Sequence, residues 1–441
     1  MPVAYVLRGE QKMDIVDNSV DTRIKKTLSY RYVVYICIAL AFFFGYFHRT
    51  AASAMSADIT AAFNISPTAL GLFGSMYFYA YAVGQLPAGI LADRWGIRRT
   101  ISVFVILAGV GCLVLGFSPN FTVALFGRFL IGFGAGFIYV PAVRMITDWF
   151  KRSESGTFTG ILVAVGNSGS LCSAGPLIAV MALIGWQNAM NAIGIIILVI
   201  AVIDYIFIRN KPEDIGGAPV YEMEGRSAPS GNKIGIGESL KIVARNYNFW
   251  TITVMFLAMY GTIMSFQGLW AGPYIRNVYG LTPIESGSYL NLIPIGMIIG
   301  CPVSGFISDK FRNRKNVMFC GVIGYILVWV PLIFMIDSMS MNIIRVVFFL
   351  YGFFGGFFPL FYSNLKENID VSITGTATGF LNTFVFVFSA LFQQLMGIVV
   401  NQYKIENNVI PVVAFKTSFI IMFVILCVAA VFYATQKKQK A

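Results

Sequence analysis

The sequence predicts an all-α membrane protein, with twelve transmembrane helices arranged as two pseudo-symmetric six-helix bundles. Three observations lead to this prediction. Of the 441 residues, 57% are hydrophobic and only 12% are charged, whereas soluble domains carry about 25% charged residues. The apolar residues form long runs, and the two halves of the chain repeat each other's motifs at a nearly constant offset.

The length of the apolar runs identifies the spanning elements as helices. A helix needs about 20 apolar residues to cross the hydrocarbon core, and closed barrels are the only other structures that span it. The runs in this chain are long and continuously apolar, which favours helices. We therefore expect twelve of them, at residues 32–57, 68–92, 101–119, 121–148, 157–181, 186–208, 249–275, 284–308, 316–336, 341–366, 373–400 and 411–434.

The longest polar stretch separates the two predicted bundles. It contains Lys211–Asp214 and a segment rich in serine, proline and glycine at 227–231, a composition typical of linkers. We expect five parts in the order N-terminal tail, first bundle, linker, second bundle and C-terminal tail: 1–31, 32–208, 209–248, 249–434 and 435–441.

The basic residues predict the orientation. Lysine and arginine accumulate in cytoplasmic segments, and with the N-terminus inside, all but seven of the 32 fall there. Both tails and the linker are therefore expected in the cytoplasm, with the chain crossing a cell inner membrane many times. The net charge of +12 is then a topology signal rather than a sign of nucleic-acid binding. The seven exceptions are Arg49, Arg128, Arg144, Arg276, Arg345, Lys404 and Lys416.

The six cysteines and the N-terminus point to no other class of protein. All six cysteines lie in apolar stretches and none forms a CxxC pair, so they read as packing residues and not as disulfides or metal ligands. The first thirty residues lack a signal-peptide core. We find no metal-binding, P-loop, nucleophile-elbow or dinucleotide-binding motif in a polar setting. We expect no enzyme activity and no cofactor.

An internal repeat supports the division of the chain into two related halves. The segment 89–99 at the end of the second predicted helix matches 305–314 at the end of the eighth, with Asp93 and Asp309 separated by 216 positions. Pro67 and Pro283, just before these helices, have the same separation. The agreement places helices 1–6 over helices 7–12.

These motifs resemble those of the major facilitator superfamily. The segment 89–99 is similar to its loop signature, and other residues resemble its helix 4 and, more loosely, its helix 5 signatures. The resemblance covers nearly the whole chain and implies a transporter whose two bundles move around a central site. The residues of the helix 4 and helix 5 signatures are Arg128, Gly132, Gly134, Gly136, Gly169, Gly175 and Pro176.

Charged groups at the cytoplasmic helix ends are candidates for gating. A carboxylate among guanidinium groups can hold helices together in one conformation and release them in another. The alternative is that these charges only set the topology. The glycines after Arg128 allow close helix packing, and that arginine is expected to be structural. The gating candidates are Asp93, Arg94, Arg98, Arg99, Arg128, Asp309, Lys310 and Arg312.

Arg49 is the leading candidate for substrate binding, because a charge inside a membrane helix is costly and usually functional. Tyr46, Arg49 and Ser53 share one helix face. The arginine resembles that of the organic-anion (anion:cation symporter) and organophosphate branches, where it meets an anionic substrate group; a guanidinium forks onto carboxylate or phosphate. The alternative is that Arg49 reaches the outer interface.

Arg144 has two interpretations. A similar arginine in the same branches lies at the cytoplasmic end of helix 4 and could bind the anion when the cavity opens inward. It could equally pair with Asp148 or Glu154 as part of a gate. The phosphate exchangers carry a second central arginine in helix 7, where this chain has Ser265, which favours a monocarboxylate, a sugar acid or an amino-acid-like substrate.

Polar residues on other helices are candidates to complete the site. Each could instead hydrogen-bond a neighbouring helix. They are Tyr77, Tyr81, Gln85, Asn167, Gln267, Trp270, Tyr274, Asn382 and Gln393.

The coupling ion is open. Proton symport needs a titrating group in the bilayer, and acidic residues are nearly absent from the helix centres. His48, whose unperturbed pKa is about 6.5, is the first candidate and Asp58 the second. Facilitated diffusion and exchange remain alternatives.

The expected function is uptake of a small organic anion by alternating access, in symport with protons. The alternative is proton-driven export of drugs or other hydrophobic compounds, which Arg49 disfavours because such exporters tend to carry a carboxylate in helix 1. A membrane sensor or scaffold would need long loops or an added domain. The expected partners are a small anionic solute, protons and the lipid bilayer; we expect a monomer.

Overall fold

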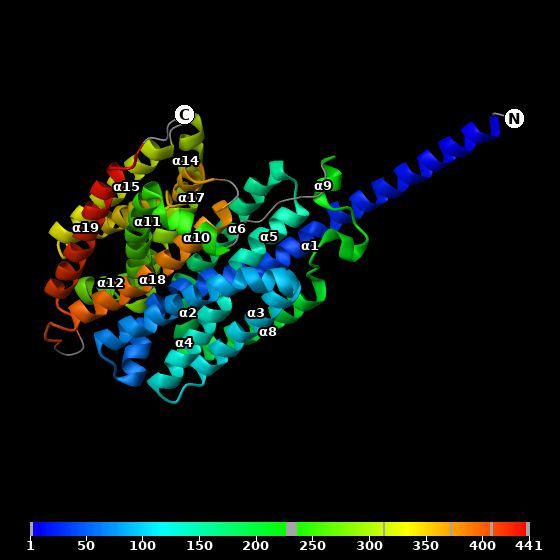
Figure 1. Ribbon diagram of the computed structural model, residues 1–441. Helices are drawn as coiled ribbons and strands as arrows, with labels where there is room; N and C mark the ends of the chain where they lie inside the picture. The colour runs from blue at the N-terminus through cyan, green and yellow to red at the C-terminus, as the bar shows by residue number, and fades with distance from the viewer. Residues whose placement is uncertain (1–2, 226–235, 312–313, 371–372, 406–408, 438–441) are drawn as a thin grey trace.

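A computed structural model describes residues 3–225, 236–311, 314–370, 373–405 and 409–437. Two helical bundles lie side by side, and the first turns of α1 project beyond them (Figure 1). Both ends of the chain lie on the same side of the molecule. The arrangement is that expected for two halves that each cross the membrane an even number of times.

The first bundle is formed by six spans, two of which are broken. The breaks fall between α4 and α5 and between α6 and α7. The helices are α1 (Val3–Phe63), α2 (Pro67–Arg94), α3 (Gly96–Gly116), α4 (Phe121–Gly136), α5 (Tyr139–Trp149), α6 (Arg152–Cys172), α7 (Gly175–Ile184) and α8 (Trp186–Phe207).

The second bundle repeats this order with three broken spans. They are broken at the π-turn η2, between α13 and α14, and between α16 and α17. The elements are α11 (Tyr247–Ser265), η2 (Phe266–Trp270), α12 (Ala271–Tyr279), α13 (Pro283–Leu290), α14 (Leu292–Phe311), α15 (Arg314–Phe334), α16 (Met341–Gly355), α17 (Pro359–Asn368), α18 (Thr374–Val400) and α19 (Val412–Ala434).

Twelve spans are accounted for within the described residues. Ten are long and apolar enough to cross a membrane, and the pair α6 and α7, bent by 40°, forms an eleventh. The 28-residue helix α2 is the twelfth. The predicted fold class is confirmed, and most predicted boundaries lie within a few residues of the observed ones.

The first helix is much longer than the predicted span 32–57. It begins at Val3 and ends at Phe63, so it includes nearly all of the stretch 1–31 that we expected to be a tail. No proline occurs between residues 3 and 66 to end it earlier. In its described residues, the predicted linker 209–248 contains three short helices: η1 (Pro212–Ile215), α9 (Val220–Met223) and α10 (Ile236–Arg245). The predicted segment 227–231 lies outside the described residues.

Matching caps explain the repeated prolines. Ser66 accepts a hydrogen bond from the Ala69 backbone amide, and Pro67 opens α2. In the second half Thr282 forms a capping box with Glu285, and Pro283 opens α13. A hydroxyl cap followed by proline at the first helical position is a favoured helix start, and it occurs at both repeat positions.

Prolines also explain where spans break. The span formed by α6 and α7 is bent at Gly175–Pro176, since α6 ends at Cys172 and α7 starts at Gly175. Breaks likewise precede Pro141, Pro294 and Pro359 by one to four residues. Two further prolines lie inside helices that continue through them: Pro87 and Pro302.

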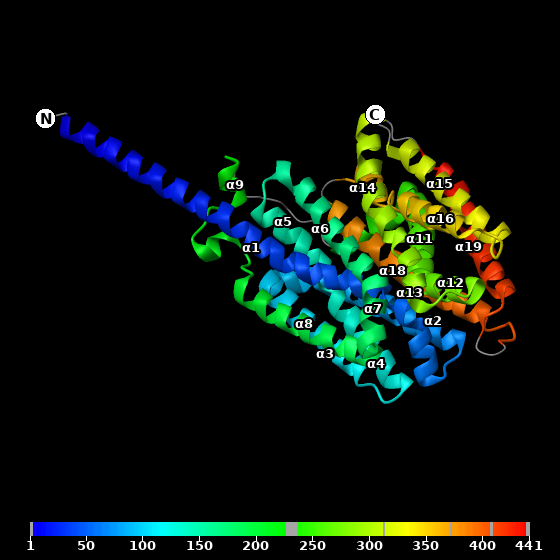
Figure 2. The same cartoon turned by 180° about the vertical axis from the view of Figure 1, so that it is seen from behind.

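The two bundles meet along a seam, in which the contact of α2 with α18 is the most extensive. There α7 packs against α13, and α1 packs against η2 and α12 (Figure 2). The backbone amide of Gly175 donates to Oδ1 of Asn291 at 3.0 Å. Midway along, the Tyr79 hydroxyl donates to Oε1 of Gln394 at 2.9 Å. These bonds join the halves where helices from both approach closely.

An ion pair holds α1 to the start of α6. Nη1 of Arg31 lies 2.7 Å from Oε2 of Glu154, and the Arg31 side chain is only 8% exposed. The guanidinium also lies 4.9 Å from the ring centres of Tyr32 and Phe150. We expect Glu154→Gln to lower the free energy of unfolding by about 1–2 kcal/mol, because it leaves a buried cation with weaker acceptors.

This expectation can be measured by thermal unfolding of the purified protein in detergent. Glu238, exposed on α10, provides the control, and Glu238→Gln should leave the unfolding midpoint unchanged. Equal midpoints for the two variants would contradict a stabilising role of the Arg31–Glu154 pair.

Candidate functional site

Arg49 lies at the centre of the molecule, where the bundles face each other. It is 3% exposed. Its Nη1 donates to the hydroxyl of Tyr260 at 2.8 Å. The guanidinium carbon lies 4.1 Å from the ring centre of Tyr46 and 5.1 Å from those of Tyr81 and Phe386. Four aromatic side chains thus surround one cation, two from each bundle; we call them the aromatic cage.

No acidic side chain in the described residues forms an ion pair with Arg49. Its Nε is buried without a hydrogen-bond partner. Aromatic faces attract a cation weakly, whereas a buried guanidinium gains most from a carboxylate or similar anion. The arrangement therefore has the donors for an anion but no protein anion to receive them.

Two members of the cage were not among the predicted site residues. They are Tyr260, on α11, and Phe386, on α18. The repeat offset placed the helix 7 counterpart of Arg49 at Ser265, whose hydroxyl instead meets the sulfur of Met396 at 3.2 Å. Tyr260 lies earlier in the same helix, α11, so the repeat offset from Arg49 gave no signal for it.

Two other predicted residues lie beside the cage. The Tyr77 hydroxyl donates to the backbone oxygen of Gly45 at 2.7 Å, and its ring stacks on Tyr81 at 5.9 Å. Oδ1 of Asn382 accepts from the Tyr362 hydroxyl at 2.6 Å. Both side chains therefore hold elements that carry the cage rather than offering free donors.

Other predicted site residues bond backbone oxygens through their polar groups. Gln85 bonds Gly136 at 2.7 Å, between α2 and α4. Asn167 bonds Val163 within α6 at 3.1 Å. The next three belong to the second bundle, with bonds of 3.0, 2.7 and 2.8 Å: Trp270 to Gln393, Gln393 to Met264 and Tyr274 to Ile336. The structure brings none of these five polar groups into contact with Arg49.

Ser53 and Arg276 form part of the seam. The Ser53 hydroxyl accepts from the Gly272 amide at 3.0 Å. Nη2 of Arg276, on α12, donates to the Ser53 backbone oxygen at 2.8 Å and to the Ser56 hydroxyl at 2.7 Å. Asp58 is half-buried and near enough to Arg276 for an electrostatic interaction. A cation of the second bundle is thus bound by oxygens of the first.

His48 points into the first bundle. Its Nε2 lies 3.2 Å from the sulfur of Cys112, on α3, and its Nδ1 has no hydrogen-bond partner in the described structure. Arg128, on α4, is also fully buried, with its guanidinium 5.0 Å from the ring centre of Tyr77. Neither side chain contributes to the aromatic cage.

Asp204 is a buried carboxylate near the end of α8 that was not among the predicted site residues. It is fully buried in α8, and neither carboxylate oxygen has a hydrogen-bond partner in the described structure. The sequence contains no signal for this burial, because a carboxylate so close to the end of a helix is expected to reach solvent. The helix α8 continues to Phe207, beyond Asp204.

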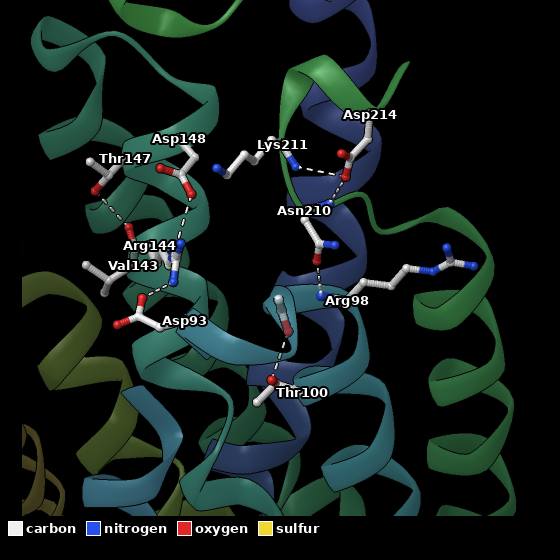
Figure 3. A network of polar contacts seen from close by, with 11 residues as sticks. Asp93, Arg98, Thr100, Val143, Arg144, Thr147, Asp148, Asn210, Lys211 and Asp214 are labelled. Atoms are coloured by element: carbon white, nitrogen blue, oxygen red, sulfur yellow. Dashed lines mark hydrogen bonds and ion pairs between the residues drawn. The ribbon is translucent and has the colours of Figure 1, made fainter. Parts of the chain in front are cut away.

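The predicted gating residues near α2 fall into two groups (Figure 3). Arg144 pairs with Asp93 and also lies 3.5 Å from Asp148, so α2 and α5 are joined through it. Nε of Arg98 donates to the Tyr205 backbone oxygen at 2.6 Å, and the side chain turns away from Asp93. Two further arginines of this loop form no ion pair with a described residue: Arg94 and Arg99.

The counterpart in the second half is incomplete in the described residues. Asp309 and Lys310 end α14 and form no ion pair with a described residue, while Arg312 lies outside the described residues. Arg314 pairs with Glu367 at 3.1 Å, which joins α15 to α17.

We expect a double-mutant cycle on Asp93 and Arg144 to give a coupling energy of about 0.5–1 kcal/mol. The side chains are 63% and 32% exposed, so solvent weakens the pair, and Asp148 adds a second acceptor. Asp93→Asn, Arg144→Gln and the double variant can be compared by thermal unfolding. The exposed pair Lys25–Asp21, at 3.7 Å, is the control; a coupling no larger than there would contradict the expectation.

Comparisons with known proteins identify the family of the chain. A family model described as Major Facilitator Superfamily matches residues 36–393. The chain is 22% identical to the probable sulfoacetate transporter SauU of Cupriavidus necator, covering 74% of this chain and 78% of that protein. It is 30% identical to the hexuronate transporter of Bacillus subtilis, covering 65% and 67%.

The fold matches solved structures. A crystal structure of a bacterial homolog of the human lysosomal transporter Spinster, in an inward-facing and unoccupied conformation, superposes with a TM-score of 0.72 at 18% identity. The match covers 93% of this chain and 99% of that one.

Proposed function

Because the chain belongs to the major facilitator superfamily and is similar to a probable sulfoacetate transporter and a hexuronate transporter, we propose that it carries a small organic anion across the cell inner membrane. The substrate class is a monocarboxylate, a sugar acid or an amino-acid-like anion. The two bundles expose the site to alternate sides of the membrane, and both chain ends face the cytoplasm.

The observation that carries this proposal is the aromatic cage. Arg49 is buried between the bundles, contacts residues of both, and has no carboxylate partner in the described residues. A ligand anion placed there would bind α1 and α11 together, so binding would favour conformations in which the halves are close. The names of the sulfoacetate and hexuronate transporters support an anion.

The substrate class follows from the number of cations. Arg144 is engaged by Asp93 and Asp148, and helix 7 carries Ser265 where a second central arginine would be expected in phosphate exchangers. One guanidinium suits a single carboxylate or sulfonate better than a doubly charged phosphate ester. The alternative, a drug exporter, is not favoured by the relatives or by the sign of Arg49.

We propose that proton coupling takes place at the seam between the bundles. Asp58 lies near Arg276, whose other partners belong to α1. Protonation of Asp58 would weaken its attraction for Arg276 and so change how tightly the bundles hold together. His48 is the weaker candidate, because it faces Cys112 inside the first bundle.

The proposal is tested by transport into proteoliposomes. Purified protein is screened for thermal stabilisation by monocarboxylates, sugar acids, sulfonates, amino acids and phosphate esters, and each stabilising compound is then followed in uptake with and without an inward proton gradient. We expect carboxylates or sulfonates to be transported and the gradient to accelerate uptake in the native protein but not in Asp58→Asn. Uptake of hydrophobic cations instead of anions would overturn the proposal.

A further inference from the structure

Asp204 lies inside the first bundle, away from the aromatic cage, and has no part in the proposed coupling. Its side chain is fully buried less than one turn before Phe207, the last residue of α8. Neither carboxylate oxygen has a hydrogen-bond partner in the described structure, and no ion pair between described residues includes it. A charged carboxylate would therefore have nothing to offset the loss of its water.

The surroundings of Asp204 are apolar. Ile200 and Ile208, four positions before and after it, are both buried. On α1, the buried thiol of Cys37 lies close enough to Asp204 for an electrostatic interaction, and Val34, one turn earlier on α1, is fully buried. A thiol offers no positive charge, so this contact does not neutralise a carboxylate.

The helices packed against α8 provide no cation for this carboxyl group. They are α1, α3 and α7, and α7 has no ionisable side chain. On α3, Nε of Arg98 donates to the backbone oxygen of Tyr205 at 2.6 Å, and its guanidinium carbon lies 4.5 Å from the ring centre of that tyrosine. Arg99 is exposed. Within the described part of the chain, the carboxyl group is left without a positive partner.

Hydrogen bonds close the end of α8 over the carboxyl group. The Tyr30 hydroxyl, on α1, donates to the backbone oxygen of Phe207 at 2.8 Å, and the Arg98 bond holds the same turn to α3. Just after the helix, Nη1 of Arg209 donates to the backbone oxygen of Ile206 at 2.6 Å. All three bonds are exposed, so they can break without disturbing the interior of the bundle and let water reach the carboxyl group.

A proton is the ligand that suits such a group. An isolated carboxylate is so unfavourable away from water that the group becomes neutral instead. The described residues contain no group of three or more His, Cys, Asp or Glu side chains that could hold a metal ion. Oε1 of Gln267 is likewise buried without a partner, but an amide is neutral in any case, whereas a carboxyl group avoids the cost of charge by binding a proton.

We propose that Asp204 is a proton-binding site of the first bundle, occupied in this conformation and emptied when the end of α8 separates from α1 and α3. The proton exchanges at the end of α8 from which the linker continues. Alkaline conditions there favour loosening of α8, because the ionised group needs water. Asp58 at the seam is a separate site, and proton binding at Asp204 does not depend on the solute that the protein carries.

Infrared spectroscopy of the purified full chain tests whether the proton is bound, because a carboxylic acid and a carboxylate differ in their C–O stretching bands. At neutral pH we expect a carboxylic-acid band in the native protein that is absent in Asp204→Asn. Asp204→Ala provides a second variant if the first does not fold. Glu213→Gln, at an exposed glutamate of the linker, is the control and should retain the band. A native protein without an Asp204-dependent band would overturn the proposal.

The pH dependence of unfolding measures the same proton. In the unfolded chain the carboxyl group is in water and ionised at neutral pH, so unfolding releases the proton and stability falls as the pH rises. Relative to Asp204→Asn, the unfolding constant of the native protein should rise about tenfold for each pH unit over which the folded chain keeps the proton. Glu213→Gln should show the native dependence. Equal pH dependence in the native protein and Asp204→Asn would overturn the site.

Cys37 reports the separation of α8 from α1. Its alkylation by N-ethylmaleimide, located by mass spectrometry, should be several-fold faster in the native protein than in Asp204→Asn at alkaline pH and equal at acidic pH. Equal rates at alkaline pH would contradict the loosening. Stabilisation by sodium chloride over choline chloride that is lost in Asp204→Asn would replace the proton with a cation. Anion uptake and its dependence on Asp58 should be retained in Asp204→Asn, so the two proposals fail separately.

Discussion

Arg49→Ala is expected to lower anion uptake by roughly two orders of magnitude, because it removes the charged donor from a desolvated site, and such losses amount to about 2–5 kcal/mol. Arg49→Lys should recover only part of the activity, since an ammonium cannot fork onto a carboxylate as a guanidinium does. Uptake into proteoliposomes and ligand-induced thermal stabilisation measure the two effects.

Two further variants distinguish a loss of anion binding from a folding defect. Tyr260→Phe removes only the hydroxyl that accepts from Nη1, so we expect a loss of about tenfold. Arg345→Ala, at an exposed arginine of α16, should behave as the native protein. Retention of ligand-induced stabilisation by Arg49→Ala would show that the anion binds elsewhere.

Replacing either of two glycines at helix crossings is expected to destabilise the fold by about 1–3 kcal/mol, through overpacking. A Cβ on Gly132 of α4 would overlap the backbone oxygen of Tyr77 on α2. A Cβ on Gly352 of α16 would overlap that of Ile293 on α14. The same crossing occurs in both halves, so Gly132→Ala and Gly352→Ala should lower the unfolding midpoint alike.

The chain provides controls within the same helix types. A Cβ on Gly160 of α6 or on Gly379 of α18 would meet no atom within 4 Å. Gly160→Ala and Gly379→Ala should therefore leave the midpoint unchanged or raise it, because alanine favours the helix by about 1 kcal/mol. A fall of the same size at all four positions would show that backbone flexibility, and not close packing, explains the glycines.

The fold could be predicted because its signals are local or repeated. Lipid exposure imposes long apolar runs, and the caps at Ser66 and Thr282 follow from short sequence patterns. The long first helix was not predicted, since its early residues are polar and only the lack of proline marks their continuation into the span. The breaks before Pro141 and Pro359 follow from proline, yet the helix α2 continues through Pro87. The sequence does not distinguish these cases.

The candidate site was harder to predict than the fold. Arg49 stood out because a charge inside a membrane helix is rare. Tyr260 did not, because a tyrosine in such a helix is ordinary and the repeat offset from Arg49 leads to Ser265 instead. Polar residues such as Gln85 and Tyr274 share the spacing of site residues, but their backbone bonds depend on how neighbouring helices pack. That information lies in contacts between distant parts of the chain.

The unbroken course of α1 has a mechanical consequence. In the first half of α1, Arg23 pairs with Glu222 at 3.1 Å and the Thr27 hydroxyl donates to the Ala218 backbone oxygen at 2.9 Å. From Arg31 the helix then extends about 27 Å along its axis to Arg49 without a break. A rod of this kind turns and shifts as one piece. A displacement of the segment between the two bundles would therefore be transmitted along α1 and would move the buried guanidinium of Arg49.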